Sequence, residues 1–210
     1  MKAYQVAVWL CGLTVAVSAW AQTTHTVYID PMSNDGPANW NNLPFNALNA
    51  TMFLVDALTN GTGIRATVKT RLNGANVNAS ASPSGDAAEF APAGANSAYG
   101  HSTEWSTVPP ILFGEVVFSN LNPTVAYSFT FYASRTGVPD IRDARYVVTG
   151  ANSGNAVLNA SNNSSATVTV ADIYPSADGV VTLRVELGPD NNNGNGFYYI
   201  TAMKFVYTEP

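Results

Sequence analysis

Alternation of apolar and polar residues is the feature of this 210-residue chain that most constrains its fold. Apolar residues occupy every second position of Tyr127–Ser134 and of Val181–Leu187. A two-residue period places successive side chains on opposite faces of a β-strand, so that one face can be buried. About ten segments have strand character by this criterion. They are His25–Asp30, Thr51–Val55, Ile64–Thr70, Leu112–Phe118, Tyr127–Ser134, Arg145–Thr149, Ala156–Asn159, Thr167–Val170, Val181–Leu187 and Phe197–Tyr207.

Turn-forming pairs separate these segments, among them Asn60-Gly61, Asn122-Pro123, Ser153-Gly154 and Asp178-Gly179. Short strands joined by such turns favour an antiparallel sandwich or barrel. No stretch after residue 21 keeps a helical period over three turns, although Phe45–Asn49 is compatible with a short helical turn. The sequence therefore predicts an all-β chain that forms a single antiparallel β-sandwich of about ten strands.

Ala75–Ser106 interrupts this pattern, because it is rich in Ala, Ser, Gly, Pro and Asn and poor in aliphatic residues. We expect a long loop here, and loops of this length tend to be functional or poorly ordered. Its aromatic residues Phe90, Tyr99 and Trp105 indicate that the segment packs against the rest of the domain.

The N-terminus has the features of a cleaved secretory signal. Lys2 precedes the apolar run Val6–Val17, and Ser18-Ala19-Trp20-Ala21 supplies the small residues of a cleavage site. The run is shorter than the roughly 20 apolar residues that span a bilayer. We expect residues 1–21 to be a signal peptide and 22–210 to be one secreted or periplasmic domain with no transmembrane segment. An uncleaved anchor and a buried first helix are the alternatives.

Composition excludes several classes of function. Cys11, the only cysteine, lies inside the predicted signal, so the exported chain would have no disulfide and no thiolate site. Lipid attachment at Cys11 is not expected, because Val8-Trp9-Leu10 lacks the small residues of such a signal. Without Lys2, eight basic residues face fourteen acidic ones, a net charge of −6. With no cluster of Lys or Arg, nucleic acid is not an expected partner.

Several motifs resemble those of bacterial exported β-sandwich domains. They are Ile29-Asp30-Pro31 with Gly36–Leu43, where Ala38 replaces a more usual Gly; Leu54-Val55-Asp56 with Gly61–Ile64; Phe118–Pro123 with Tyr127–Arg135; and Asp178-Gly179 with Tyr198–Phe205. The resemblance implies a jelly-roll sandwich similar to galactose-binding-like domains, which occur beside carbohydrate esterases and other polysaccharide-degrading modules. It also implies an accessory or carbohydrate-binding role with a polysaccharide or glycan as partner.

Catalytic patterns are missing from the sequence. There is no Gly-x-Ser-x-Gly motif, and the only histidines are His25 and His101. The glutamates are not spaced to place two carboxylates on one strand face, as glycoside hydrolysis requires. We therefore expect a non-catalytic protein. The alternatives are a structural or adhesive surface protein that assembles through its sheet edges, and a polysaccharide-active hydrolase or lyase built from distant residues.

The candidate ligand-binding residues fall in two groups. The densest charge cluster consists of Arg135, Asp140, Arg142, Asp143 and Arg145. Its first four members are the candidates to contact sugar hydroxyls. A network of ion pairs that holds this loop explains the same charges equally well. Aromatic candidates for stacking on a sugar ring are Trp105, Tyr99 and Trp40, accompanied by His101. For Trp40, packing under its turn is favoured over ligand contact, and for His101 a solvated loop position is favoured.

Two oxygen-rich segments make calcium the one metal to consider, since it takes six to eight oxygen ligands. The candidate ligands are Asp30 and Asp35 in the first segment, and Asp190, Asn191 and Asn193 in the second. Neither segment fits an EF-hand loop. A solvated hairpin tip is the favoured alternative for residues 190–195, because Asn and Gly suit turn conformations. No other cofactor is expected.

Overall fold

The computed structural model describes residues 22–32 and 37–209, so the predicted signal peptide and Asp35 lie outside the described residues. The described chain forms fourteen strands and one 3₁₀ helix. Their bounds are β1 Thr23–Asp30, β2 Trp40–Asn42, β3 Thr51–Val55, β4 Gly61–Thr70, β5 Gly74–Asn76, η1 Gly85–Ala93, β6 Ser97–His101, β7 Phe113–Ser119, β8 Tyr127–Tyr132, β9 Asp143–Thr149, β10 Ser153–Asn159, β11 Val168–Ile173, β12 Val181–Leu187, β13 Phe197–Ile200 and β14 Ala202–Glu209. None of the helices in the described residues is long and apolar enough to cross a membrane.

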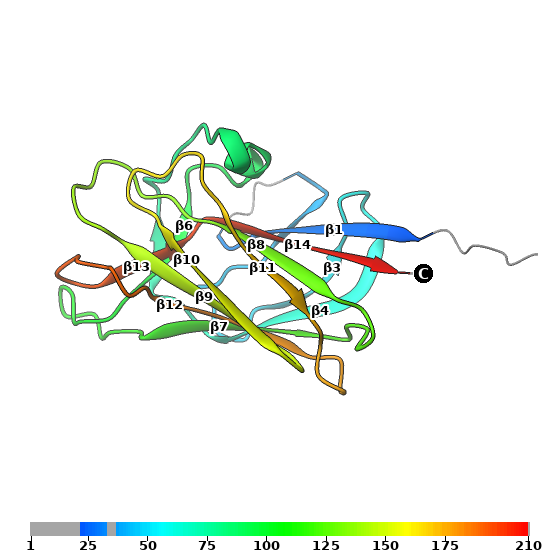
Figure 1. Ribbon diagram of the computed structural model, residues 1–210. Helices are drawn as coiled ribbons and strands as arrows, with labels where there is room; N and C mark the ends of the chain where they lie inside the picture. Colours follow the sequence, from blue (N-terminus) through cyan, green and yellow to red (C-terminus); the bar gives the residue numbers. More distant parts are fainter. Residues whose placement is uncertain (1–21, 33–36, 210) are drawn as a thin grey trace, which may run out of the picture.

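Two large sheets form a sandwich-like arrangement (Figure 1). The first sheet has the strand order β11-β8-β14-β1-β2, and the second has the order β10-β9-β12-β7-β4-β3. The pairings are antiparallel apart from that of β1 with β2, which is parallel. The predicted all-β antiparallel sandwich is therefore confirmed, with more strands than the expected ten.

An aromatic layer between the two sheets forms the core. Side chains of β7 and β8 alternate between buried and half-exposed positions, as the two-residue period predicts. Phe131 of the first sheet stacks on Tyr146 of the second, with ring centroids 4.5 Å apart. Phe118 of the second sheet meets Phe205 of the first edge-on at 5.6 Å. These contacts across the sandwich join the sheets through large buried surfaces.

A third, small sheet of order β13-β6-β5 lies at one end of the sandwich, on the left in Figure 1. The expected single strand Phe197–Tyr207 is split at Thr201, because its first part pairs with β6 and its second part pairs with β8 and β1. The Thr201 hydroxyl lies 2.7 Å from that of Ser97 and accepts the backbone N–H of Ser134 at 2.9 Å. Buried hydroxyls thus fix the point where the chain changes sheet.

The prediction of a long loop over Ala75–Ser106 is wrong, since this segment contains η1, β6 and the end of β5. The expectation that its aromatic residues pack is confirmed for Phe90, which is fully buried. Its ring is 6.0 Å from that of Tyr132 and 6.4 Å from that of Trp40. The two-residue period could not predict this strand. β6 is rich in small residues and buried on both faces, so its sequence has no alternation of apolar and polar residues.

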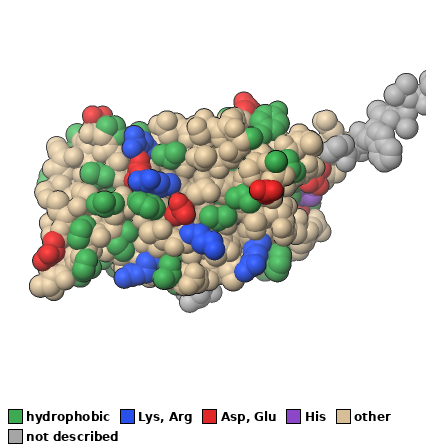
Figure 2. Space-filling view, turned by 90° about the horizontal axis from the view of Figure 1, so that it is seen from below, with side chains coloured by type: hydrophobic (Ala, Val, Ile, Leu, Met, Phe, Trp, Pro, Cys, Tyr) green, Lys and Arg blue, Asp and Glu red, His purple; other side chains and the backbone are tan. Residues whose placement is uncertain are grey.

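The side of the molecule that carries β7 and β12 presents basic, acidic and hydrophobic side chains mixed together (Figure 2). Arg184 of β12 shows the pattern, since its guanidinium lies 3.8 Å from the Phe113 ring centroid and 2.6 Å from the Glu186 carboxylate. Among the residues that the structure describes, no patch of one charge covers this side.

Candidate functional site

A pocket of about 280 Å³ lies at the end of the sandwich where the third sheet is found. Four of the predicted ligand-binding residues line it together, although they come from β6, the β6–β7 loop and the β8–β9 loop. The complete lining is Ala75, Asn76, Tyr99, Trp105, Arg135, Arg142, Phe197 and Tyr199.

One wall of the pocket is aromatic. Phe197 and Tyr199 are two residues apart on β13 and therefore share one face of the strand, and Tyr99 on β6 is the cross-strand partner of Tyr199. The ring centroids of Tyr99 and Phe197 are 5.6 Å apart, and those of Trp105 and Phe197 are 5.3 Å apart. Trp105 is 41% exposed, which leaves part of its ring for a ligand. The pleat of this small sheet thus places the rings of Tyr99, Phe197 and Tyr199 side by side at the pocket.

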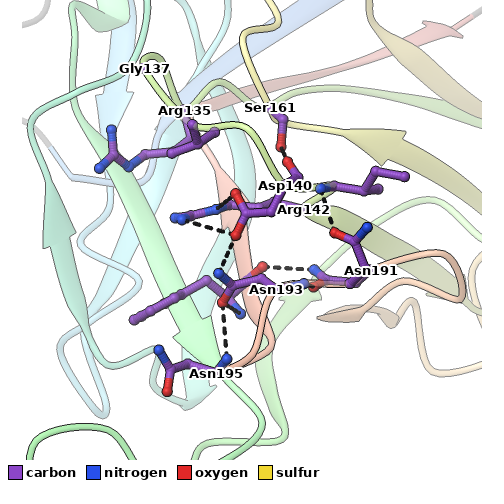
Figure 3. Close-up of polar contacts among 12 residues, drawn as sticks. Arg135, Gly137, Asp140, Arg142, Ser161, Asn191, Asn193 and Asn195 are labelled. Atoms are coloured by element: carbon purple, nitrogen blue, oxygen red, sulfur yellow. Dashed lines mark hydrogen bonds and ion pairs between the residues drawn. The ribbon is translucent and has the colours of Figure 1, made fainter.

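Arg142 and Asp140 form an ion pair at the same pocket (Figure 3). Arg142 Nε donates to Asp140 Oδ1 at 2.9 Å, and Arg142 Nη1 donates to the Tyr199 hydroxyl at 2.6 Å. Burial acts to raise the pKa of the Asp140 carboxyl, but the hydrogen bonds from Arg142 and Asn193 outweigh it and hold this pKa below its usual value. Asp140 therefore stays ionised and orients the Arg142 guanidinium.

Arg135 supplies a second guanidinium to the pocket. Its Nη1 donates to the Thr136 carbonyl at 2.5 Å, whereas its buried Nε has no hydrogen-bond partner. Among the residues that the structure describes, no carboxylate pairs with Arg135. The interpretation of the charge cluster as ion pairs thus fits Arg142 and does not fit Arg135.

The asparagine-rich loop between β12 and β13 is built on its own side-chain amides. Asn191 Nδ2 donates to the Asp143 and Phe197 carbonyls, at 3.0 and 2.8 Å. Asn191 Oδ1 accepts the Asn193 backbone N–H, and Asn193 Oδ1 accepts those of Asn195 and Phe197. Asn193 Nδ2 donates to Asp140, which ties the loop to the ion pair (Figure 3). These two asparagines therefore position Phe197 and Asp140 at the pocket.

The other proposed calcium ligands are dispersed. Asp190 is exposed at the start of this loop, and Asp30 is buried at the end of β1, where its Oδ1 accepts the Met32 backbone N–H at 2.8 Å. Asp35 lies outside the described residues. Within residues 22–32 and 37–209, no group of three or more His, Cys, Asp or Glu is placed to hold a metal ion.

Thermal unfolding tests whether the β12–β13 loop binds calcium. Because the amide oxygens of Asn191 and Asn193 already accept N–H groups of the loop, we expect the unfolding midpoint to be nearly the same in excess calcium and in chelator. An ion bound only to the folded state would raise the midpoint with its concentration. A rise of several degrees that disappears in an Asp190→Ala variant would place calcium in this loop and contradict the expectation.

Four predicted residues do not line the pocket, although one of them, Asp140, pairs with Arg142, which does. Trp40 is 6% exposed and stacks on Tyr28 with ring centroids 4.9 Å apart, in agreement with packing under its turn. Asp143 is buried at the start of β9, where burial raises the pKa of its carboxyl. A solvated position for His101 is wrong, since this residue is fully buried.

His101 packs against two residues of the aromatic wall. Its ring is 5.6 Å from that of Phe197 and 6.2 Å from that of Trp105. Its Nδ1 lies 2.7 Å from the Thr103 carbonyl, so that nitrogen carries the proton and the ring is held in place.

The sequence interpretation missed Phe197, Tyr199 and Asn76 as site residues. Phe197 and Tyr199 were visible as part of a strand, and their shared face was the only signal that they act together. Neither the scan of protein-family models nor the search of curated proteins finds a match to this chain, so the resemblance to galactose-binding-like domains stays a prediction.

Proposed function

We propose that this chain is a secreted, non-catalytic carbohydrate-binding protein whose end pocket holds a sugar unit of a glycan. The observation that carries the proposal is the convergence of four aromatic side chains with two arginines and an asparagine amide in one pocket. Aromatic rings fit the C–H faces of pyranoses, while a few fixed polar groups give orientation and specificity.

The size of the pocket supports a small ligand. Its volume of about 280 Å³ lies near the lower end of the roughly 300–1,000 Å³ that is usual for ligand pockets. One ring-sized unit at the end of a chain, or a branch, matches this space better than a long stretch of polysaccharide.

The chemistry of the lining favours binding over hydrolysis. Glycoside cleavage uses two carboxylates that flank the scissile bond. The described residues that line the pocket instead supply guanidinium, amide, phenol and indole groups. These groups donate hydrogen bonds and stack on rings, which is the chemistry of recognition.

The jelly-roll type and the export of the chain belong to the same proposal. Consecutive strands cross between the large sheets, since β7 and β9 lie in the second sheet and β8 lies in the first. Such crossings are a feature of double-sheet jelly rolls. An exported jelly roll with an end pocket would act as an accessory module on glycans outside the cytoplasm.

Replacing Trp105 with alanine tests the proposal. The partly exposed indole of Trp105 offers ring surface to a ligand beside Phe197. We therefore expect Trp105→Ala to weaken glycan binding about tenfold, equal to ~1.4 kcal/mol. Isothermal titration calorimetry with plant, algal and host oligosaccharides measures the effect, after affinity electrophoresis has selected the ligand.

Phe53 provides the matched control. It is 65% exposed on the edge strand β3 and does not line the pocket, so Phe53→Ala should leave the affinity unchanged. Equal losses in the two variants would contradict the assignment of binding to the pocket. Folded protein that binds none of the glycans would overturn the function itself.

A further inference from the structure

We propose that the sugar unit held in the pocket is anionic, a hexuronate, and that Arg135 binds its carboxylate. This inference rests on the proposed carbohydrate-binding function and names the class of sugar. It starts from an imbalance of charge, since Arg135 and Arg142 both line the pocket and only Asp140 faces them as a carboxylate partner among the described residues.

Arg142 has no need of an anionic ligand. Two of its nitrogens donate to the Asp140 carboxylate, at 2.9 and 3.3 Å, and a third donates to the Tyr199 hydroxyl. Its charge is therefore compensated and its donors are largely occupied. What remains at the pocket is the positive charge of Arg135.

Arg135 is unusual because it is a half-buried cation that lines the pocket and forms no ion pair with a carboxylate of the described residues. Arg65, Lys69 and Arg71 also form no ion pair, but all three are exposed to solvent. The chain has 14 acidic and 9 basic residues, and four of the basic side chains in the described part form ion pairs with carboxylates. The buried Nε of Arg135 has no hydrogen-bond partner at all. A half-buried guanidinium without a counterion costs free energy, and an anionic ligand beside it would supply the missing counterion.

The backbone holds Arg135 firmly at this position. Its N–H donates to the Ala160 carbonyl at 2.7 Å, and its own carbonyl accepts the N–H of Asn162 at 2.8 Å. Figure 3 shows its side chain extending to the same side as the Arg142 guanidinium. One guanidinium nitrogen, Nη1, is also held by the Thr136 carbonyl. A donor group that is partly fixed before binding loses less entropy when the ligand arrives.

A carboxylate on a sugar ring fits these features together. A guanidinium presents paired N–H donors that match the two oxygens of a carboxylate. The ring that carries the carboxylate would lie against Tyr99, Phe197 and Trp105. The Phe197 centroid is 5.6 Å from that of Tyr99 and 5.3 Å from that of Trp105. One excess positive charge and one ring-sized space correspond to a singly charged sugar.

Titration with matched saccharides tests the inference. The ligands are short oligomers of glucuronate, galacturonate and mannuronate, each compared with its neutral methyl ester, together with galactose 6-sulfate. We expect at least one uronate to bind about tenfold or more tightly than its own ester, as a charge-assisted hydrogen bond implies. The preference should shrink as salt is added.

Arg135→Gln should abolish the preference for the acid over the ester, measured as the ratio of the two affinities in the same variant. Arg135→Lys keeps the charge and loses the paired donors, so it should keep part of the preference for the acid. A partial preference in this variant would show that the loss in Arg135→Gln does not come from misfolding. Arg65→Gln serves as the matched control. Arg65 is an exposed residue of β4 that does not line the pocket, so this variant should keep the full preference.

The outcomes separate this inference from the function on which it rests. Equal binding of acids and esters, or binding of galactose 6-sulfate alone, would overturn the hexuronate assignment and leave carbohydrate binding intact. A preference that survives Arg135→Gln would overturn the role of Arg135. Failure of every saccharide, charged or neutral, would overturn the carbohydrate-binding function as well.

Discussion

Replacing Asp56 with alanine is expected to lower the free energy of unfolding by about 3 kcal/mol. The residue is 3% exposed, and its carboxylate accepts the backbone N–H groups of Leu58 and Asn60 at 2.9 and 2.8 Å. It also lies 3.0 Å from Nδ1 of His25, whose ring stacks on Tyr207. Alanine would leave these donors without an acceptor inside the protein. Urea unfolding near pH 7 measures the loss.

The same carboxylate makes stability depend on pH. Burial acts to raise the pKa of Asp56, but the hydrogen bonds from His25, Asn60 and Leu58 outweigh it and place this pKa below the ordinary value of 3.8. An acid with a depressed pKa in the folded state stabilises the protein above its unfolded pKa, and this contribution is lost as the pH falls through the folded value. Between about pH 5 and pH 2, the Asp56→Ala protein should therefore lose less stability than the parent protein does.

Asp178 gives the control for this substitution, because it is exposed in the turn between β11 and β12. Asp178→Ala should change the unfolding free energy by less than about 0.5 kcal/mol. If Asp56→Ala were equally mild, or if it left the acid dependence of unfolding unchanged, the hydrogen-bonded carboxylate would not have the role that its contacts indicate.

The two-residue period predicted most of the fold because most strands bury one face. Thr51–Val55 and Val181–Leu187 have the bounds expected from their alternation. The strands that escaped prediction lack this signal: β2 and β5 have three residues each, and β6 is buried on both faces. The break at Thr201 depends on which strands its two neighbours pair with, and local pattern does not contain that information.

The sequence predicted four of the eight residues that line the pocket. Charge clustering pointed to Arg135 and Arg142, and aromatic residues in a segment without strand alternation pointed to Tyr99 and Trp105. Phe197 and Tyr199 are apolar residues in a strand, a pattern typical of core, and only the pairing of β13 with β6 brings them to the pocket. Trp40 is the opposite case, a predicted site residue that belongs to the core. From sequence alone, a tryptophan beside a turn can either contact a ligand or pack inside the protein. Trp40 is buried and stacks on Tyr28, so it packs.

Gly100→Ala is expected to destabilise the protein by about 3 kcal/mol and to weaken glycan binding at the pocket. A methyl group at Gly100 would lie 2.2 Å from both Cζ and Oη of Tyr198, its partner on β13. That ring is fully buried, and its hydroxyl donates to the Ile111 carbonyl at 2.6 Å. A shift of the ring away from the methyl group would strain this hydrogen bond, and Ile111 belongs to the loop that carries Trp105.

Gly194 is the matched control, because it lies in the β12–β13 loop at the same end of the molecule and no atom lies within 4 Å of the position that an added Cβ would take. Gly194→Ala should change the unfolding free energy by less than about 0.5 kcal/mol and leave binding intact. Urea unfolding and saccharide titration of both variants, at a temperature where each is folded, measure the two effects together. If Gly100→Ala kept full affinity despite its lower stability, the Tyr198–Ile111 hydrogen bond would not be what positions the Trp105 loop.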